Sequence, residues 1–417
     1  MINRNVWGVV LVSAALVGVQ GAWAEGERLL HLENTIGAGY DDNMYYTEKN
    51  KASSFTLRDE LVLTADHPIK DGTGFIGLRY HLGYTWFEDR SDSQNVLSHT
   101  VDFIFNRSFA RVWTLGLVDT FMRVENPEAI TADGTIRREN TTYNYNTLNG
   151  DLVRTIGSKS RIGLSGRWQE LDYDKAPAST LENYDIYSVG LMGGTQIGKD
   201  SMISVNGRYE DTVYMHSGDA LTVVTPGAAE GSVLEVPNRD NQSYFGGLGV
   251  DKMFSPNLMG KASVGYQYTS FEAANSKSDS SPYGEIYLTV LPVPSTRITL
   301  GGTYSMYQSG ISTFANQHRT SGTLSLGHDF TSKLTLTLYG TLINSDYKAK
   351  DSVDNVLERT VSSGTETAAS YAARLSFRLN RNNWIEAGWT YTDFTTKFAD
   401  RSQYDHNYGD ISWKIRL

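Results

Sequence analysis

The chain has 417 residues, of which 40% are hydrophobic and 20% are charged, and its formal net charge is −10 at pH 7. This negative balance, with no basic stripe along the sequence, argues against nucleic acid as a partner. The chain contains no cysteine, which excludes disulfides as a source of stability. A soluble protein of this length would be expected to have two or three domains, whereas one large barrel would not.

Residues 1–24 have the features of a signal peptide. Arg4 lies in a short n-region, an apolar run follows, and Ala22-Trp23-Ala24 precedes Glu25. We expect cleavage near Ala24. No later stretch approaches the ~18 consecutive apolar residues of a membrane-spanning helix. Since the first strand pattern starts soon after Glu25, we predict that residues 25–417 form a single β-barrel domain without a plug.

The first predicted strand ends in a glycine-rich motif. Residues 37–44 read Gly-Ala-Gly-Tyr-Asp-Asp-Asn-Met, so Tyr40, Asp41, Asp42 and Asn43 stand where the first long loop begins. This motif resembles the opening signature of the putative β-barrel porin type 2 family, which includes outer-membrane proteins associated with exopolysaccharide operons. The resemblance implies an outer-membrane barrel and a link to surface polysaccharide, and it implies no defined site.

The same motif offers oxygen ligands to a calcium ion. Asp41, Asp42 and Asn43 are adjacent, however, and three adjacent oxygens cannot all converge on one ion from an extended segment. The spaced ligands of a calcium loop are missing. We therefore favour a polar junction between strand and loop, and predict no metal and no cofactor.

The stretch from Gly74 to Phe87 shows the pattern on which the fold prediction depends. Its even-numbered residues from position 76 to 86 are apolar, whereas Gly77, Arg79 and Thr85 on the other phase are small, charged or polar. An extended strand with one apolar face and one wet face is typical of a wall between lipid and water. Tyr84 and Trp86 fall at one end, where aromatic rings anchor at a headgroup layer.

Strands of this kind recur to the end of the chain, separated by connections that are alternately long and short. The pattern predicts an all-β fold, a transmembrane up-and-down antiparallel β-barrel of about eighteen strands. An even number of strands places both termini on the side of the short turns, which we predict to be periplasmic. The nine prolines all fall in predicted loops, turns or strand ends, as expected for a residue that cannot donate to the ladder.

Two strands depart from the pattern. Asp119 falls on the apolar phase set by Trp113, Leu115 and Leu117, which predicts a β-bulge there or a strand that leaves the membrane early. The polar stretch from Thr141 to Val153 leaves its register open.

The longest loop extends from His216 to Asp240. Its two apolar runs lie on either side of Pro226-Gly227, which predicts a hairpin that extends outward. The alternative is a loop that folds inward and constricts the lumen.

The last strand alternates through Ile411, Trp413 and Ile415 to Leu417. It looks like the recognition signal of the outer-membrane assembly machinery, although Leu417 replaces the usual terminal aromatic residue. The expected partners are therefore outer-membrane lipid and this machinery, and the expected location is the outer membrane of a Gram-negative-type cell.

The inward phase of the predicted strands carries charges of both signs. The candidate lumen-lining residues are Arg79, Asp102, Arg167, Arg208, Glu210, Asp251, Lys261, Glu285, Arg374, Arg378 and Glu386. Because the signs nearly balance, we expect a hydrated interior of mixed charge rather than a strongly ion-selective one. The alternative is that these side chains only pair across neighbouring strands.

These features favour a passive, water-filled channel. Inward tyrosines such as Tyr287, Tyr307 and Tyr339 favour a saccharide as cargo, although tyrosine is also a common interfacial residue of such barrels. The absence of a plug pattern argues against an active transporter. Since the eight histidines are scattered and no nucleophile motif surrounds them, we predict no catalytic residue and no enzyme. The alternatives are a structural or adhesive barrel with a closed lumen and, less favoured, an outer-membrane enzyme.

Overall fold

The computed structural model describes residues 29–69, 72–90, 95–126, 129–130, 136–137, 141–174, 182–215, 220–222, 233–235, 238–272, 278–309, 314, 316–348, 363–398 and 403–417. The predicted signal peptide lies outside this range. Within the described residues, no helix has the length and apolar character needed to cross a membrane.

The described residues form twenty-two strands. They are β1 (Leu30–Asp41), β2 (Ser54–Pro68), β3 (Gly74–Phe87), β4 (Asn95–Phe109), β5 (Trp113–Asn126), β6 (Ala129–Ile130), β7 (Ile136–Arg137), β8 (Thr141–Ile156), β9 (Ser160–Tyr173), β10 (Tyr184–Gln196), β11 (Ser201–Tyr214), β12 (Ala220–Thr222), β13 (Val233–Glu235), β14 (Asn241–Ser255), β15 (Leu258–Phe271), β16 (Asp279–Val293), β17 (Thr296–Gln308), β18 (Asn316–Asp329), β19 (Leu334–Tyr347), β20 (Gly364–Asn380), β21 (Asn383–Thr396) and β22 (Tyr404–Arg416).

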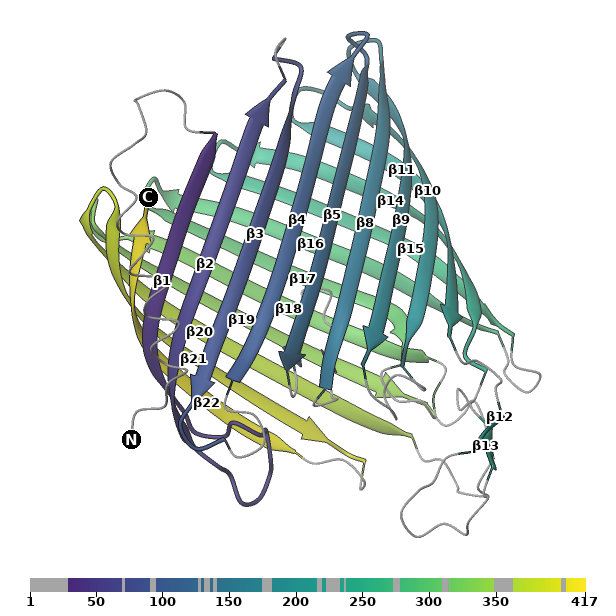
Figure 1. Ribbon diagram of the computed structural model, residues 1–417. Helices are drawn as coiled ribbons and strands as arrows, with labels where there is room; N and C mark the ends of the chain where they lie inside the picture. Colours follow the sequence, from purple (N-terminus) through teal and green to yellow (C-terminus); the bar gives the residue numbers. More distant parts are fainter. Residues whose placement is uncertain are drawn as a thin grey trace.

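Eighteen of these strands form one closed barrel, and the short pairs β6–β7 and β12–β13 are separate from it (Figure 1). Each barrel strand pairs antiparallel with the barrel strand that follows it in the chain. The ladder closes where β1 meets β22, from the pair Glu33 and Arg416 to the pair Asp41 and Tyr408. The predicted antiparallel barrel of eighteen strands is confirmed.

Side chains alternate along each strand between the convex and the concave face of the barrel wall, and the two faces differ in polarity. On the convex face of β14, Tyr244, Leu248 and Val250 are exposed. On the concave face, side chains converge across several strands, because inward-pointing groups of a curved wall approach one another. The Tyr283 hydroxyl on β16, for example, donates to the Asn206 side chain on β11 at 3.1 Å. The apolar phase is therefore the outer surface, and the polar phase is the inner one.

Aromatic residues mark both edges of the outer apolar surface. Near the long loops, the rings of Tyr209, Tyr244 and Tyr268 form a row with centroid distances of 5.2 and 6.4 Å. At the turn end of β14, Phe254 is exposed on the same phase as Tyr244. Ten residues separate these two positions, and a strand tilted by ~40° covers about 25 Å of height over that distance. This is the height expected for the apolar band of a transmembrane barrel.

The two strands that departed from the pattern are regular. The predicted β-bulge at Asp119 is wrong, because β5 keeps its register through this residue, with Phe103 opposite on β4 and Leu148 on β8. β8 likewise pairs without a shift against β5 and β9. The irregular positions in β14, β16 and β20 lie instead beside the short turns, where a change in chain direction must be accommodated.

The longest loop contains the two predicted strands. Leu221 on β12 pairs with Leu234 on β13 in a short antiparallel ladder. Figure 1 shows this pair beyond the ends of the barrel strands. Residues 216–219, 223–232 and 236–237, which include Pro226 and Gly227, lie outside the described residues, so the alternative of an inward constriction stays untested.

A pair of arginine substitutions tests the assignment of the two faces. Val264 is 65% exposed on the outer phase at the middle of β15, and Ser263 beside it is on the inner phase. We expect Val264→Arg to lower the free energy of unfolding by about 2–4 kcal/mol, as for a cation on a lipid face near the midplane. Ser263→Arg should cost much less, because its charge enters water. Urea titration in lipid vesicles measures both, and equal losses would contradict the assignment.

Candidate functional site

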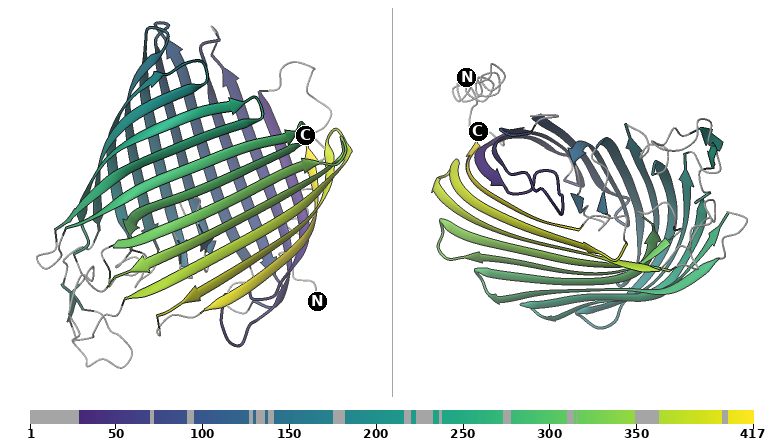
Figure 2. Two further views of the ribbon diagram at one scale, coloured as in Figure 1. Left: turned by 180° about the vertical axis from the view of Figure 1, so that it is seen from behind. Right: turned by 90° about the horizontal axis from the view of Figure 1, so that it is seen from below.

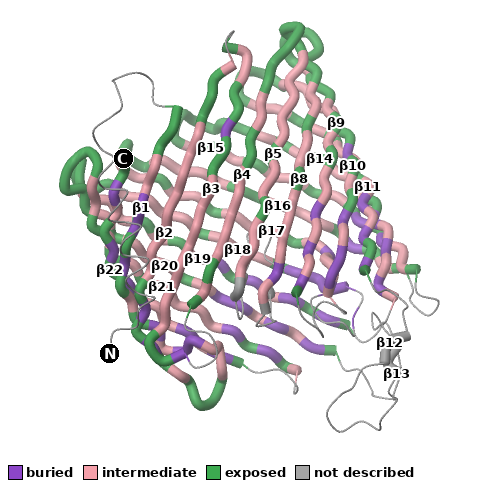
Figure 3. Tube along the Cα trace, viewed as in Figure 1, coloured by how far each residue is buried: buried purple, intermediate pink, exposed green. Residues whose placement is uncertain are grey.

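The inner wall is most buried at the end of the barrel that carries the long connections, here called the loop-side mouth (Figure 3). On β8 to β11 it carries a buried apolar cluster, here called the aromatic wall. Its members are Tyr143, Leu171, Tyr173, Tyr184, Ile186 and Tyr214. Two contacts between rings join neighbouring strands, Tyr143 with Tyr173 at 5.6 Å and Tyr184 with Tyr214 at 5.7 Å. A water-filled lumen would leave such inward rings exposed, so other parts of the chain must cover them.

Arg239 is one of the groups that cover the aromatic wall. Its side chain is 2% exposed, with the guanidinium carbon 4.2 Å from the centre of the Tyr214 ring and one nitrogen 3.4 Å from the Glu182 carboxylate. Burial alone would lower the pKa of Arg239, but the neighbouring Tyr214 and Glu182 raise it above its ordinary value, so the charge is retained. The guanidinium also donates to the carbonyl of Ser309, which follows β17. Arg239 thereby ties two loops together.

The loop that begins at Ser309 also contacts residues at the loop-side ends of β19 and β21, on a different part of the barrel from the aromatic wall. The Phe314 ring contacts Tyr347 at 5.3 Å and Phe398 at 5.8 Å. Both Phe314 and Tyr347 are buried. Contacts from this loop therefore join two different parts of the mouth.

Residues 42–53, which connect β1 to β2, fold inward at the mouth. Asn43 is fully buried, and its side-chain amide donates to the carbonyls of Thr47 and Asp405, each at 2.9 Å. The Tyr46 ring packs on Tyr404 and His406 of β22, with centroids 5.2 and 4.6 Å apart. Figure 2 shows this dark purple segment within the outline of the opening. The mouth is thus narrower than the barrel.

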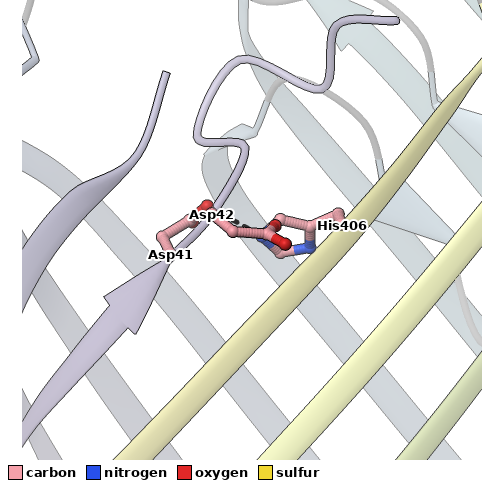
Figure 4. Close-up of side chains that lie close together, drawn as sticks. All are labelled: Asp41, Asp42 and His406. Carbon is pink, nitrogen blue, oxygen red and sulfur yellow. Dashed lines mark hydrogen bonds and ion pairs between the residues drawn. The ribbon is translucent and has the colours of Figure 1, made fainter. Parts of the chain in front are cut away.

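Asp41, Asp42 and His406 gather where β1 ends beside β22 (Figure 4). Their potential ligand atoms all lie within 4.8 Å of one another, which makes them a candidate metal site. Asp41 Oδ1 is already 3.0 Å from His406 Nε2 and accepts from the Asn43 backbone at 2.9 Å. Both Asp42 oxygens accept from Asn407, at 2.7 and 2.8 Å. These five residues, here called the seam clamp, therefore favour the predicted polar junction over an ion site.

Further into the lumen, charged side chains bridge the same seam. The Asp410 side chain on β22 is 3% exposed, and it lies 3.3 Å from Arg58 on β2 and 3.5 Å from Arg374 on β20. Arg374 also pairs with Glu386 at 3.1 Å. We call Arg58, Asp410, Arg374 and Glu386 the seam network.

Glycine makes the seam network possible. Gly388 stands opposite both Asp410 and Arg374 in the ladder. A Cβ at this position would overlap Asp410 Oδ1 and would lie 3.0 Å from Arg374 Nη2, so it would displace the Asp410 side chain. The bare backbone at Gly388 lets Arg374 reach across β21 to Asp410.

Most of the predicted lumen-lining residues come together in pairs. Glu210 lies 2.7 Å from Arg167 and 3.8 Å from Arg208. Lys261 and Glu285 lie 2.9 Å apart, and Asp251 stands opposite Lys261 in the ladder. Lys261 and Glu285 thus pair across neighbouring strands, as in the alternative, whereas Arg167 and Glu210 pair across the intervening strand β10.

The remaining predicted residues have other surroundings. Arg79 stands opposite Asp102 in the ladder, and Asp102 accepts a hydrogen bond from Thr120 at 2.9 Å. Arg378 lies at the turn end, where it donates to the Ser332 carbonyl at 2.7 Å. It is therefore remote from the loop-side mouth.

Four functional candidates were missed in the sequence, namely Arg58, Arg239, His406 and Asp410. Arg58 alternates with Leu57, so the inner phase of its strand was a usable signal. Asp410 and His406 reach their partners Arg58 and Asp41 only because β22 lies beside β1, which the sequence does not show. Arg239 lies outside any strand and gave no periodic signal.

Comparison with known proteins supports the family resemblance for the second half of the chain. Residues 228–416, which include β14 to β22, match the family model described as putative beta-barrel porin 2. The motif at Tyr40 to Asn43 lies outside the matched region. No curated protein sequence matches the chain.

Several solved structures are similar in fold to this chain over most of its length. The outer membrane protein OpdK from Pseudomonas aeruginosa is 9% identical, with 93% of this chain and 99% of that chain covered and a TM-score of 0.46. OccK2 (OpdF) from Pseudomonas aeruginosa is 12% identical, with 93% and 98% covered and a TM-score of 0.46. A BenF-like porin from Pseudomonas fluorescens is 13% identical, with 94% and 99% covered and a TM-score of 0.46. The barrel itself is established by the strand pairing described above.

Removing one carboxylate tests the seam clamp. Asp42→Ala deletes the acceptor of two hydrogen bonds from Asn407, and we expect it to lower the free energy of unfolding by about 2 kcal/mol. Asp200→Ala, at an exposed position on a short turn, is the control. Urea unfolding in vesicles gives both values. A loss no greater than that of the control would mean that the clamp does not stabilise the closed barrel.

Proposed function

We propose that this protein is a passive outer-membrane channel that gives water-soluble solutes a path across the bilayer. The supporting observation is the closed barrel of eighteen strands whose outer phase is apolar and whose inner phase carries hydrogen-bonded and ion-paired side chains. A barrel of this strand number is too wide for its side chains to fill, so its lumen holds water. A packed interior would instead need apolar side chains on both phases.

The proposal includes an orientation. The start of β1 and the end of β22 both lie at the turn side of the barrel. The Leu417 amide there donates to the Leu32 carbonyl at 2.8 Å. We place this side in the periplasm of a Gram-negative-type cell, after removal of residues 1–24, with β22 as the strand that the assembly machinery recognises. The loop-side mouth then faces outward from the cell.

We propose a saccharide as the cargo. Paired charges of opposite sign leave little net charge on the inner wall, which favours neutral solutes over ions. Tyr287 is 38% exposed on the inner phase and offers a ring for stacking on a sugar. The Tyr307 ring is engaged with the Arg319 guanidinium, 4.5 Å from its centre. Export of an exopolysaccharide strand would require residues 42–53 to move away from the mouth.

A second candidate function is a structural or adhesive barrel with a closed lumen. The narrowing at the loop-side mouth favours it, because the aromatic wall and the contacts of Phe314 are buried there. We make no proposal of catalysis, because among the described residues we identify no side-chain arrangement that would activate a nucleophile.

Liposome swelling separates the two candidates. Proteoliposomes are mixed with iso-osmotic mono-, di-, tri- and tetrasaccharides, and protein-free liposomes are the control. A channel gives swelling whose rate falls as the sugar grows. If the purified, folded protein gives no swelling with any of these sugars, the channel proposal is overturned in favour of a closed barrel.

Shortening the inward segment tests whether it limits flow. Replacing residues 44–52 with a short Gly-Ser linker removes the Tyr46 contacts but leaves Asp41, Asp42 and Asn43 in place, and we expect single-channel conductance to rise. Deletion of residues 221–236, which include β13 and most of β12, is the matched control and should leave conductance unchanged. An unchanged conductance in the first variant would place the narrowest point elsewhere.

The seam network gives a prediction on ion preference. Asp410→Asn keeps the shape of the side chain but removes the negative charge beside Arg58 and Arg374. We expect the reversal potential in a salt gradient across a planar bilayer to shift toward anion preference. Asp200→Asn at the turn end serves as the control. No shift in either variant would show that ions do not pass close to Asp410.

A further inference from the structure

The inner phase of β16 carries a tyrosine whose ring lies over bare backbone. Tyr283 stands opposite Gly265 on β15, and Gly265 stands opposite Gly247 on β14. A Cβ at Gly265 would overlap the Tyr283 ring, and a Cβ at Gly247 would overlap its hydroxyl. The ring therefore extends across two strands along the wall to β11, where its hydroxyl donates to Asn206. This hydrogen bond and the two glycines fix the position of the ring.

A second inner tyrosine on β16 has the same relation to a glycine on the other side. Tyr287 stands opposite Gly301 on β17. A Cβ at Gly301 would lie 2.9 Å from Cε1 and 3.0 Å from Cδ1 of the Tyr287 ring. Each of the two rings thus has one face toward the barrel wall and the other toward the lumen. In agreement with this, Tyr287 is 38% exposed and Tyr283 is half-buried.

A polar row separates the two tyrosines. Glu285 lies between them on the inner phase of β16, with Ser263 opposite on β15 and Thr303 opposite on β17. The Glu285 carboxylate lies 2.9 Å from the ammonium of Lys261, whose side chain is 55% exposed. The row therefore presents hydroxyl, carboxylate and ammonium groups to the lumen between two aromatic rings.

This arrangement matches the chemistry of a sugar chain. The C–H face of a pyranose is apolar and stacks on an aromatic ring, whereas its hydroxyls donate to a carboxylate and accept from an ammonium. Four residues of strand separate Tyr283 from Tyr287, which places their Cα atoms ~13 Å apart. One monosaccharide cannot contact both rings over this distance, whereas a chain of a few units can.

We propose that the inner face of β16 binds a neutral oligosaccharide longer than one pyranose unit. The site, here called the saccharide track, consists of Tyr283, Glu285, Tyr287 and Lys261. One sugar unit stacks on each tyrosine, and the hydroxyls between them bind the ion pair. Because Lys261 is paired with Glu285, the track has no excess positive charge that would favour an acidic sugar. The proposal rests on the proposed channel, through which the sugar reaches the track.

The test is isothermal titration calorimetry of the folded full chain in lauryldimethylamine oxide, a detergent whose headgroup contains no sugar. The probes are glucose, cellotriose and maltotriose, which differ in length and in linkage. We expect at least one trisaccharide to bind about tenfold more tightly than glucose, because it contacts two rings rather than one. The proposal is overturned if neither trisaccharide binds more tightly than glucose, which includes the absence of any binding.

Substitution of the rings shows whether they hold the sugar. Tyr283→Ala and Tyr287→Ala should each weaken trisaccharide binding about tenfold, to the level of glucose. Tyr287→Phe keeps the ring and should bind as the unmodified protein does. The control is Tyr266→Ala, which removes a 57% exposed ring from the outer phase of β15. Equal binding by Tyr287→Ala and Tyr266→Ala would contradict the proposal. Heat-dependent mobility in gels verifies that each variant is folded.

A glycine substitution tests the position of a ring without removing it. Gly265→Ala places a methyl group where the Tyr283 ring lies, so we expect the ring to be displaced and trisaccharide binding to weaken as in Tyr283→Ala. Gly246→Ala, on the outer phase of β14, is the matched control, since a Cβ there meets nothing within 4 Å. Unchanged binding by Gly265→Ala would show that the ring need not lie on the wall, against the proposal.

Conductance in planar bilayers, measured on the same protein, separates this proposal from that of the channel. Conductance without tighter binding of a trisaccharide would overturn the saccharide track and leave the channel in place. Tighter binding of a trisaccharide without conductance or liposome swelling would support the track and overturn the channel.

Discussion

The structure depends on the pairing of β1 with β22. In a bilayer, an unpaired backbone N–H or C=O group has no water to bond, so an open sheet edge costs several kcal/mol for each group left unpaired. The ladder between Glu33 and Arg416 at one end and Asp41 and Tyr408 at the other removes both edges at once. The charged and polar groups along this seam reinforce closure from the inside.

Closure also determines how the two faces of the wall differ. Once the sheet is curved, side chains on the convex phase diverge toward lipid, and those on the concave phase converge. Convergence brings Arg167 within 2.7 Å of Glu210 across the intervening strand β10, and it brings Arg58 and Arg374 to Asp410. The same convergence at the loop-side mouth lets a short segment such as residues 42–53 narrow the opening.

The sequence was sufficient for the features that depend on local alternation. The number of strands, their antiparallel order and the phase of most charged residues follow from a period of two within each strand. What it could not supply were contacts between strands far apart in the chain. Asp410 gave no local sign of a role, because its partners Arg58 and Arg374 come from β2 and β20. The β-bulge predicted at Asp119 was wrong for a related reason. A polar residue on the apolar phase suggested a break in register, and the unbroken pairing of β5 with β4 and β8 could not be seen from the sequence of β5 alone.

The seam clamp has a consequence for how the barrel is made. His406 and Asp41 are separated by 365 positions in the chain, so their contact exists only once the first and last strands have met. The hydrogen bonds that Asp41 and Asp42 make with His406 and Asn407 are therefore present in the closed barrel and absent from an open sheet.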